Sequence, residues 1–199
     1  MRKILLLLIS SCISCSLWAS TPDGGSLLGA FDAKLKELGC YRVKFEVKAE
    51  GYTTTGEYVV SGSDFYVASD GVEVYVENGV KYQVNRESRE IVIDSAATLG
   101  SDIISNPAQG FSSLSENFQV TEAVEGGRRS VSLASKQGAA VSEAITIVAD
   151  ERGELPARIV YAGDGGSIII EVKSVERSSA GLPRFDIGKY AGYESVDMR

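Results

Sequence analysis

Alternation with a period of two is the feature of this sequence that most constrains its fold. In residues 41–49, five apolar or aromatic residues alternate with four charged ones. Successive side chains of a β-strand point to opposite faces, so this pattern predicts a strand with one buried and one solvated face. The dipeptides Asp70-Gly71 and Asn78-Gly79, which favour two-residue hairpin turns, predict that such strands pair with their neighbours in the chain.

The same pattern recurs along most of the chain. The expected strands are 41–49, 58–60, 65–68, 72–76, 80–84, 91–93, 118–123, 130–135, 144–149, 157–162 and 167–175, with a last strand-like segment at 185–187. Short loops rich in turn residues separate them, which predicts antiparallel neighbours. A sheet of eleven or twelve twisted strands curls or closes, and its inner face must then be covered.

Two segments follow a helical period instead. Residues 27–38 carry leucines and a phenylalanine on one face and charged residues on the other, which predicts an amphipathic helix. Residues 96–118 separate the two runs of strands. Asn106-Pro107 favours a helix start, and Phe111 begins a series of apolar residues at helical spacing, so the sequence predicts a long helical insertion there.

The first nineteen residues are typical of an export signal. Arg2 and Lys3 precede an apolar run, and Ala19 is a small residue at a plausible cleavage point. We expect residues 1–19 to be removed as a signal peptide and residues 20–199 to form a single domain. In an alternative interpretation, the four residues ending at Cys12 are a loose lipobox, and acylation of Cys12 tethers the chain to a membrane.

Composition disfavours catalysis and polyanion binding. The sequence has no histidine, the usual general base and the commonest metal ligand. After residue 19 it has no Gly-x-Ser-x-Gly, phosphate-binding loop or Cys-x-x-Cys motif. That part holds 18 basic and 27 acidic residues, a formal charge of −9, which does not suit nucleic acid. We therefore expect that the chain is not an enzyme and binds no cofactor, metal or nucleic acid. We also expect a monomer.

One loop offers the alternative of a carboxylate-based hydrolase or a Ca²⁺ site. Asp150, Glu151 and Glu154 lie close together there, and paired carboxylates can cleave glycosides or bind Ca²⁺. The same loop contains Arg152-Gly153 between two expected strands. Turn residues in a solvated loop are the favoured interpretation.

The order of the elements and several short phrases resemble the periplasmic lipoprotein carriers of the LolA type. Residues 41–45 resemble the first strand of that family, and residues 56–60 followed by 64–67 resemble the second and third. Residues 69–75, Ser-Asp-Gly-Val-Glu-Val-Tyr, resemble its SDG–W-Y passage, and Phe-Asp-Ile at 185–187 resembles its ending. The resemblance spans nearly all of residues 20–199.

The resemblance implies a mostly β (α+β) fold: a curved antiparallel half-barrel of about eleven strands with an N-terminal helix and a helical lid. It also implies a periplasmic carrier or chaperone that holds the acyl chains of lipoproteins, or a related lipid, for transfer toward the outer membrane. Inner-membrane release machinery and an outer-membrane acceptor would then be its partners. The alternative is a non-catalytic binding module of the same fold, tethered through Cys12, that recognises another lipid or a protein.

We expect the cavity wall to consist of apolar residues from the two helical segments and the first six strands. They are Phe31, Leu35, Phe45, Val47, Tyr58, Val60, Phe65, Val67, Val74, Tyr82, Ile91, Phe111 and Leu114. Ordinary core packing is the alternative for each of them. The carriers hold an arginine just before a proline as a lid latch, but residues 60–64 contain neither, so no latch residue is expected here.

Overall fold

The computed structural model describes residues 26–100, 103, 106–136, 144–163 and 166–199, and the expected signal peptide and Cys12 lie outside these ranges. Twelve strands form one sheet in the order β12-β6-β5-β4-β3-β2-β1-β11-β10-β9-β8-β7. The strands are β1 (Tyr41–Ala49), β2 (Tyr52–Ser61), β3 (Asp64–Ser69), β4 (Val72–Glu77), β5 (Val80–Asn85), β6 (Glu90–Ser95), β7 (Phe118–Glu125), β8 (Arg128–Ser135), β9 (Ala144–Ala149), β10 (Pro156–Gly163), β11 (Gly166–Arg177) and β12 (Glu194–Asp197). The helices are α1 (Leu27–Leu38) and α2 (Leu114–Asn117), with 3₁₀ turns at Ala96–Thr98 and Ile187–Tyr190.

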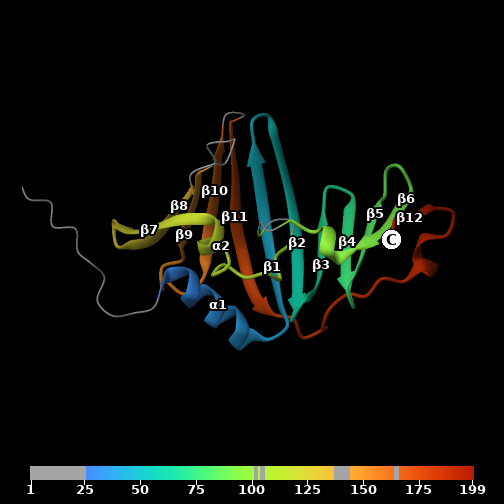
Figure 1. Ribbon diagram of the computed structural model, residues 1–199, viewed down its shortest axis with the longest axis horizontal. Coiled ribbons are helices and arrows are strands. Elements are labelled where there is room, and N and C mark those ends of the chain that lie inside the picture. Colours follow the sequence, from blue (N-terminus) through green and yellow to red (C-terminus); the bar gives the residue numbers. More distant parts are fainter. Residues whose placement is uncertain (1–25, 101–102, 104–105, 137–143, 164–165) are drawn as a thin grey trace, which may run out of the picture.

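The sheet is open and curved, with β7 and β12 at its edges (Figure 1). All neighbouring strands are antiparallel except β12, which runs parallel to β6. Asp70, Gly71, Asn78 and Gly79 have φ angles of 51°, 74°, 51° and 78°, the positive values that a type I′ hairpin turn requires. The predicted mostly β half-barrel is confirmed, with twelve strands, and β2 begins six residues earlier than the pattern indicated.

Helix α1 matches the helix predicted from the sequence. Ser26 caps its start by accepting a hydrogen bond from the N–H of Gly29, and Gly39, with φ of 71°, ends it. The buried face of α1 packs into one apolar core with residues of β8 and β9, among them Leu133 and Ile147. Within the described ranges, no helix is long and apolar enough to cross a membrane.

The sheet has an apolar core on each face, and β2, β3 and β4 contribute to both. Its concave face, toward α1, holds the larger core, which includes Phe65 and Val76. A second core lies on the convex face. There Tyr66, Tyr75 and their neighbours pack against residues 182–193, which we call the C-terminal segment. The sequence predicted a strand-like segment at 185–187, which is wrong. Phe185 stacks instead on the ring of Tyr82, 4.1 Å away, and a 3₁₀ turn follows.

The long helical insertion predicted at 96–118 is also wrong. Only α2, four residues long, and one 3₁₀ turn are helical among the residues of this stretch that the structure describes. Gly110 has a φ angle of 82°, which interrupts any helix. The next two backbone N–H groups, those of Phe111 and Ser112, donate to the carboxylate of Asp32 rather than to helical carbonyls. A tertiary contact has thus replaced local helix formation.

A candidate apolar cavity beneath a polar-anchored cover

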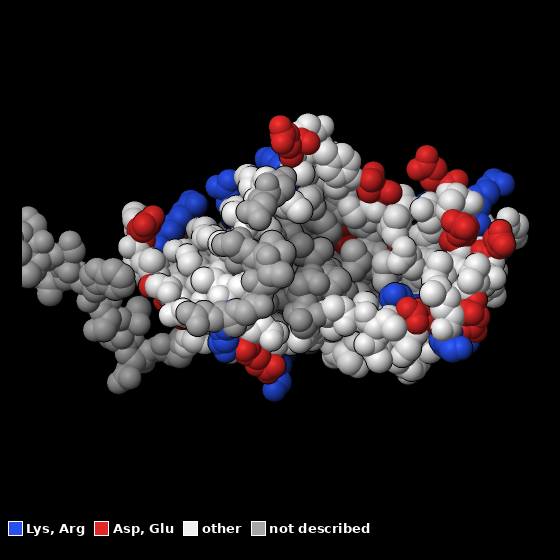
Figure 2. Space-filling view, turned by 45° about the horizontal axis from the view of Figure 1, so that its top comes forward, with Lys and Arg blue, Asp and Glu red and all other residues white. Residues whose placement is uncertain are grey.

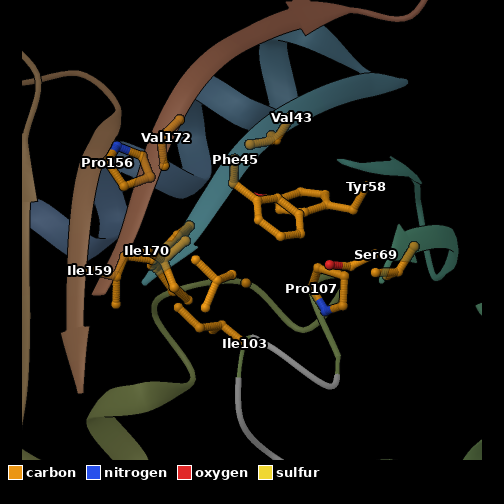
Figure 3. A pocket seen from close by; sticks show the side chains of 14 residues that line it. Val43, Phe45, Tyr58, Ser69, Ile103, Pro107, Pro156, Ile159, Ile170 and Val172 are labelled. Atoms are coloured by element: carbon orange, nitrogen blue, oxygen red, sulfur yellow. The ribbon is translucent and has the colours of Figure 1, made fainter. Parts of the chain in front are cut away.

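A cavity of about 190 Å³ lies on the concave face, between the middle of the sheet and the described part of the insertion (Figure 3). Its fourteen lining residues come from β1, β2, β3, β10, β11 and the stretch between Ile103 and Phe111. None of the fourteen carries a formal charge, and Ser69 and Tyr58 supply the only side-chain hydroxyls. The cavity can therefore shelter hydrocarbon and offers a charged group no counterion.

Aromatic residues of β1 and β2 form one wall of the cavity. Phe45 and Tyr58 lie side by side with ring centroids 6.0 Å apart (Figure 3). The ring of Phe45 also lies over Gly56, where an added Cβ would come within 2.6 Å of Phe45 Cζ and 2.7 Å of the Ala68 carbonyl oxygen. Burial raises the pKa of Tyr58 far above its ordinary value, so its phenol stays uncharged and adds no ionic character.

Aliphatic residues of β10 and β11 complete the sheet side. Ile159 pairs with Ile170, and Val172 pairs with Phe45 across the β1–β11 ladder. Cross-strand partners share a face, so these side chains lie next to the aromatic wall. Figure 3 shows them converging on the same space from the side opposite Tyr58.

The cover of the cavity, which we define as Ile103 and residues 106–113, is anchored to α1. Asp32 Oδ1 accepts a hydrogen bond from the Phe111 N–H at 2.7 Å, and Asp32 Oδ2 accepts one from the Ser112 N–H at 2.8 Å. The rings of Phe31 and Phe111 meet edge to face, with centroids 5.4 Å apart. A carboxylate on α1 thus attaches the cover to the helix, a contact that the sequence did not predict.

No charged side chain lines the cavity among the described residues. In the view of Figure 2, the charged side chains of the described residues are scattered along the margins of the face, with a few nearer its middle. The carboxylates of the 150–154 loop have structural partners: Asp150 Oδ1 accepts from the Glu154 N–H at 2.8 Å, and Glu154 pairs with Lys34 at 3.3 Å. No group of His, Cys, Asp and Glu suited to a metal ion occurs among the residues that the structure describes.

The structure places the thirteen predicted wall residues in three groups. Five line the cavity: Phe45, Val47, Tyr58, Val67 and Phe111. Six belong to the concave-face core around it: Phe31, Leu35, Val60, Phe65, Val74 and Leu114. Phe65 and Val74, together with Val67, also line a neighbouring hollow of the same face.

For Tyr82 and Ile91 the predicted facing is wrong. Both belong to the convex-face core beneath the C-terminal segment. Tyr82 pairs with Tyr75, which lies on that same face, so its neighbour Lys81 points to the concave side. The alternation in β5 and β6 gave the right period, but a period does not tell which face the rest of the chain will cover.

Several lining residues were absent from the prediction. The alternation of Ile168, Ile170 and Val172 in β11 is a signal that could have identified two of them. Ile103 and Pro107 have no such signal, because they lie outside regular structure and reach the cavity only through the path of the insertion.

Comparison with known proteins finds a solved structure with a similar fold. No family model and no curated protein sequence matches the chain. An uncharacterized conserved protein from Thermus thermophilus matches in structure with a TM-score of 0.54 and 11% identity, over 86% of this chain and 96% of that one. This match shows that the half-open sheet occurs elsewhere, and it says nothing of a ligand.

Two further structures match less closely. The LolA superfamily protein NE2245 from Nitrosomonas europaea matches with a TM-score of 0.40 and 7% identity, over 83% of this chain and 96% of that one. MucB matches with a TM-score of 0.46 and 15% identity, over 80% of this chain and 62% of that one. A LolA superfamily structure is thus among the matches.

Proposed function

We propose that this chain is an exported, non-catalytic carrier that binds the hydrocarbon chains of lipids or of acylated proteins on its concave face. The observation that carries the proposal is a cavity whose described lining residues carry no charge, beneath a cover that two hydrogen bonds attach to Asp32. In this proposal residues 1–19 direct export, residues 20–199 form the single carrier domain, and the bound chain travels toward the outer membrane.

The physical chemistry of hydrocarbon suits this site. Each methylene group removed from water contributes about 0.8 kcal/mol, so a few buried methylenes already give useful affinity. Pockets for whole small molecules usually measure about 300–1,000 Å³, which exceeds the cavity present here. A long chain therefore needs the space that the cover fills with Ile103 and Phe111, and displacement of the cover accompanies binding. Competition between cover and ligand keeps binding reversible.

The test is native mass spectrometry of the exported protein, followed by extraction of bound lipid. We expect acyl lipids with the unmodified protein and their loss in Val47→Glu, because this substitution places a carboxylate on the cavity wall. Val124→Glu on edge strand β7, where the valine is 58% exposed, is the matched control and keeps the lipid. A protein that neither carries nor takes up lipid, or a Val47→Glu variant that binds as well as the control, refutes the proposal.

A further inference from the structure

A second hollow adjoins the cavity on the concave face. It measures about 240 Å³, and Val67 lines both spaces. Phe65 and Val74 make its near side apolar, whereas Lys81 and Gln83 of β5 make its far side polar. Val67 separates the two spaces, and from one to the other the lining changes from apolar side chains to side chains that form hydrogen bonds.

The strand register shows that the lining changes from apolar to polar in the direction from β2 to β5. Tyr58 of β2 pairs with Val67 of β3, Val67 with Val74 of β4, and Val74 with Gln83 of β5. Neighbouring strands are about 4.8 Å apart, so the row extends roughly 14 Å from the aromatic wall to the amide of Gln83. A parallel row from Val60 through Phe65 and Val76 ends at Lys81.

The polar end arises because most apolar side chains of β5 and β6 lie on the convex face of the sheet. Tyr82, Val84, Ile91 and Ile93 of these strands turn to the convex face, where the C-terminal segment covers them, whereas Val92 pairs with Gln83 on the concave side. Their alternate neighbours, Lys81, Gln83 and Asp94, are thereby directed to the concave side. The polar end is thus produced by the same strands that build the second core.

The charge at this end is balanced. Lys81 Nζ lies 3.3 Å from Asp94 Oδ2, and the two side chains are only 18% and 16% exposed. The Asp94 carboxylate also accepts hydrogen bonds from Thr98 Oγ1 at 2.8 Å and from the Ser95 N–H at 2.7 Å. An anionic head group placed here would meet Asp94, whereas an uncharged one can accept from the Lys81 ammonium and exchange hydrogen bonds with the Gln83 amide.

We propose that the ligand is an amphiphile with an uncharged, hydroxyl- or amide-bearing head group, bound in one orientation. Its tail lies in the cavity beneath Phe111, and its head lies over β5 between Lys81 and Gln83. This inference rests on the proposed function and adds to it the class of head group and the direction of the bound molecule.

The experiment measures displacement of the uncharged fluorescent probe N-phenylnaphthylamine by three ligands that share one tail: monopalmitoylglycerol, methyl palmitate and palmitate. We expect monopalmitoylglycerol to bind about tenfold more tightly than either of the others, the effect of one or two net hydrogen bonds. Gln83→Leu and Lys81→Met each bring the affinity for monopalmitoylglycerol close to that for methyl palmitate. Gln119→Leu on β7 and Lys44→Met on the convex side of β1, both exposed positions, change nothing.

The outcomes separate the two proposals. Probe that no ligand displaces overturns the proposed function itself. Equal affinities for all three ligands, unchanged in Gln83→Leu, leave a tail-binding carrier and overturn the head-group inference. Tightest binding of palmitate, lost in Lys81→Met, shows an anionic head and also overturns the inference. Gln83→Leu leaves the Lys81–Asp94 ion pair intact, so this variant decides the matter even if Lys81→Met does not fold.

Discussion

At the scale of single residues, the cavity depends on one close approach between an aromatic ring and a glycine. Phe45 can lie along the sheet, and leave space beside it, because its cross-strand partner Gly56 has no side chain. The backbone oxygen of Ala68 approaches the same point from β3. A methyl group at this position has no free space, since one of its neighbours is backbone that cannot rotate away.

Gly56→Ala should therefore destabilise the protein by about 1–3 kcal/mol, the usual cost of overpacking a filled site. The displaced Phe45 ring should also reduce binding of an apolar dye. Urea unfolding measures the first effect and dye titration the second. Gly163→Ala is the control, because nothing lies within 4 Å of its added Cβ and its φ angle is not positive. Equal unfolding midpoints for the two variants would show that the close approach has no energetic weight.

At the scale of elements, the cover is held by tertiary contacts more than by its own secondary structure. Asp32 of α1 accepts two backbone hydrogen bonds from it, and Phe31 supports the Phe111 ring. Hydrogen bonds to a charged acceptor contribute more than neutral ones, so this one carboxylate controls much of the closure.

Asp32→Ala should loosen the cover and cost about 1–3 kcal/mol of unfolding free energy. Dye binding should become faster, because the cover leaves the cavity more readily, while Asp32→Asn, which keeps one acceptor, should lie between. Stopped-flow fluorescence with the same dye provides the measurement. Glu37→Ala on the same helix serves as control, since its carboxylate pairs only with Lys34 at the surface among the described residues. Uptake that is equally fast in all four proteins would contradict an anchoring role.

At the scale of the whole molecule, a buried carboxylate joins the C-terminal segment to the convex face. Tyr190 donates to Glu73 Oε2 at 2.9 Å, Tyr66 donates to Glu73 Oε1 at 2.9 Å, and Arg86 lies 3.0 Å from the carboxylate. Burial alone would raise the pKa of Glu73, but the hydrogen bonds from Arg86, Tyr190 and Tyr66 together hold it below the ordinary value of 4.5.

Because the pKa of Glu73 is lowered in the folded protein, the free energy of unfolding depends on pH. A folded pKa below the unfolded one contributes stability that is present above about pH 4.5 and is lost as the pH falls through the folded value. Thermal unfolding between about pH 7 and about pH 3 should show a loss of stability that is smaller in Glu73→Gln than in the unmodified protein. Glu125→Gln, exposed on edge strand β7, should follow the unmodified protein. Parallel curves for Glu73→Gln and the unmodified protein would exclude this contribution.

The features that the sequence predicted correctly are those that depend on interactions between residues close together in the chain. Period-two alternation and the dipeptides at 70–71 and 78–79 act locally, so the strands, the hairpins and α1 could be predicted. The half-open sheet was implied by the resemblance to the LolA-type carriers. Of the five predicted wall residues that line the cavity, four lie on the apolar concave side of β1, β2 and β3, and the fifth, Phe111, belongs to the cover.

The predictions that were wrong concern features that depend on contacts between distant parts of the chain. Tyr82 and Ile91 face the convex side because a segment about a hundred residues further on covers them, and the insertion is not a helix because Asp32 binds its backbone N–H groups. The amino-acid pattern was sufficient for the strands, their turns and their approximate number, since these follow from neighbouring residues. Long-range packing selected the buried face of β5 and β6, and with it the polar end of the neighbouring hollow, because the apolar side of these strands is buried only where the distant C-terminal segment packs against it.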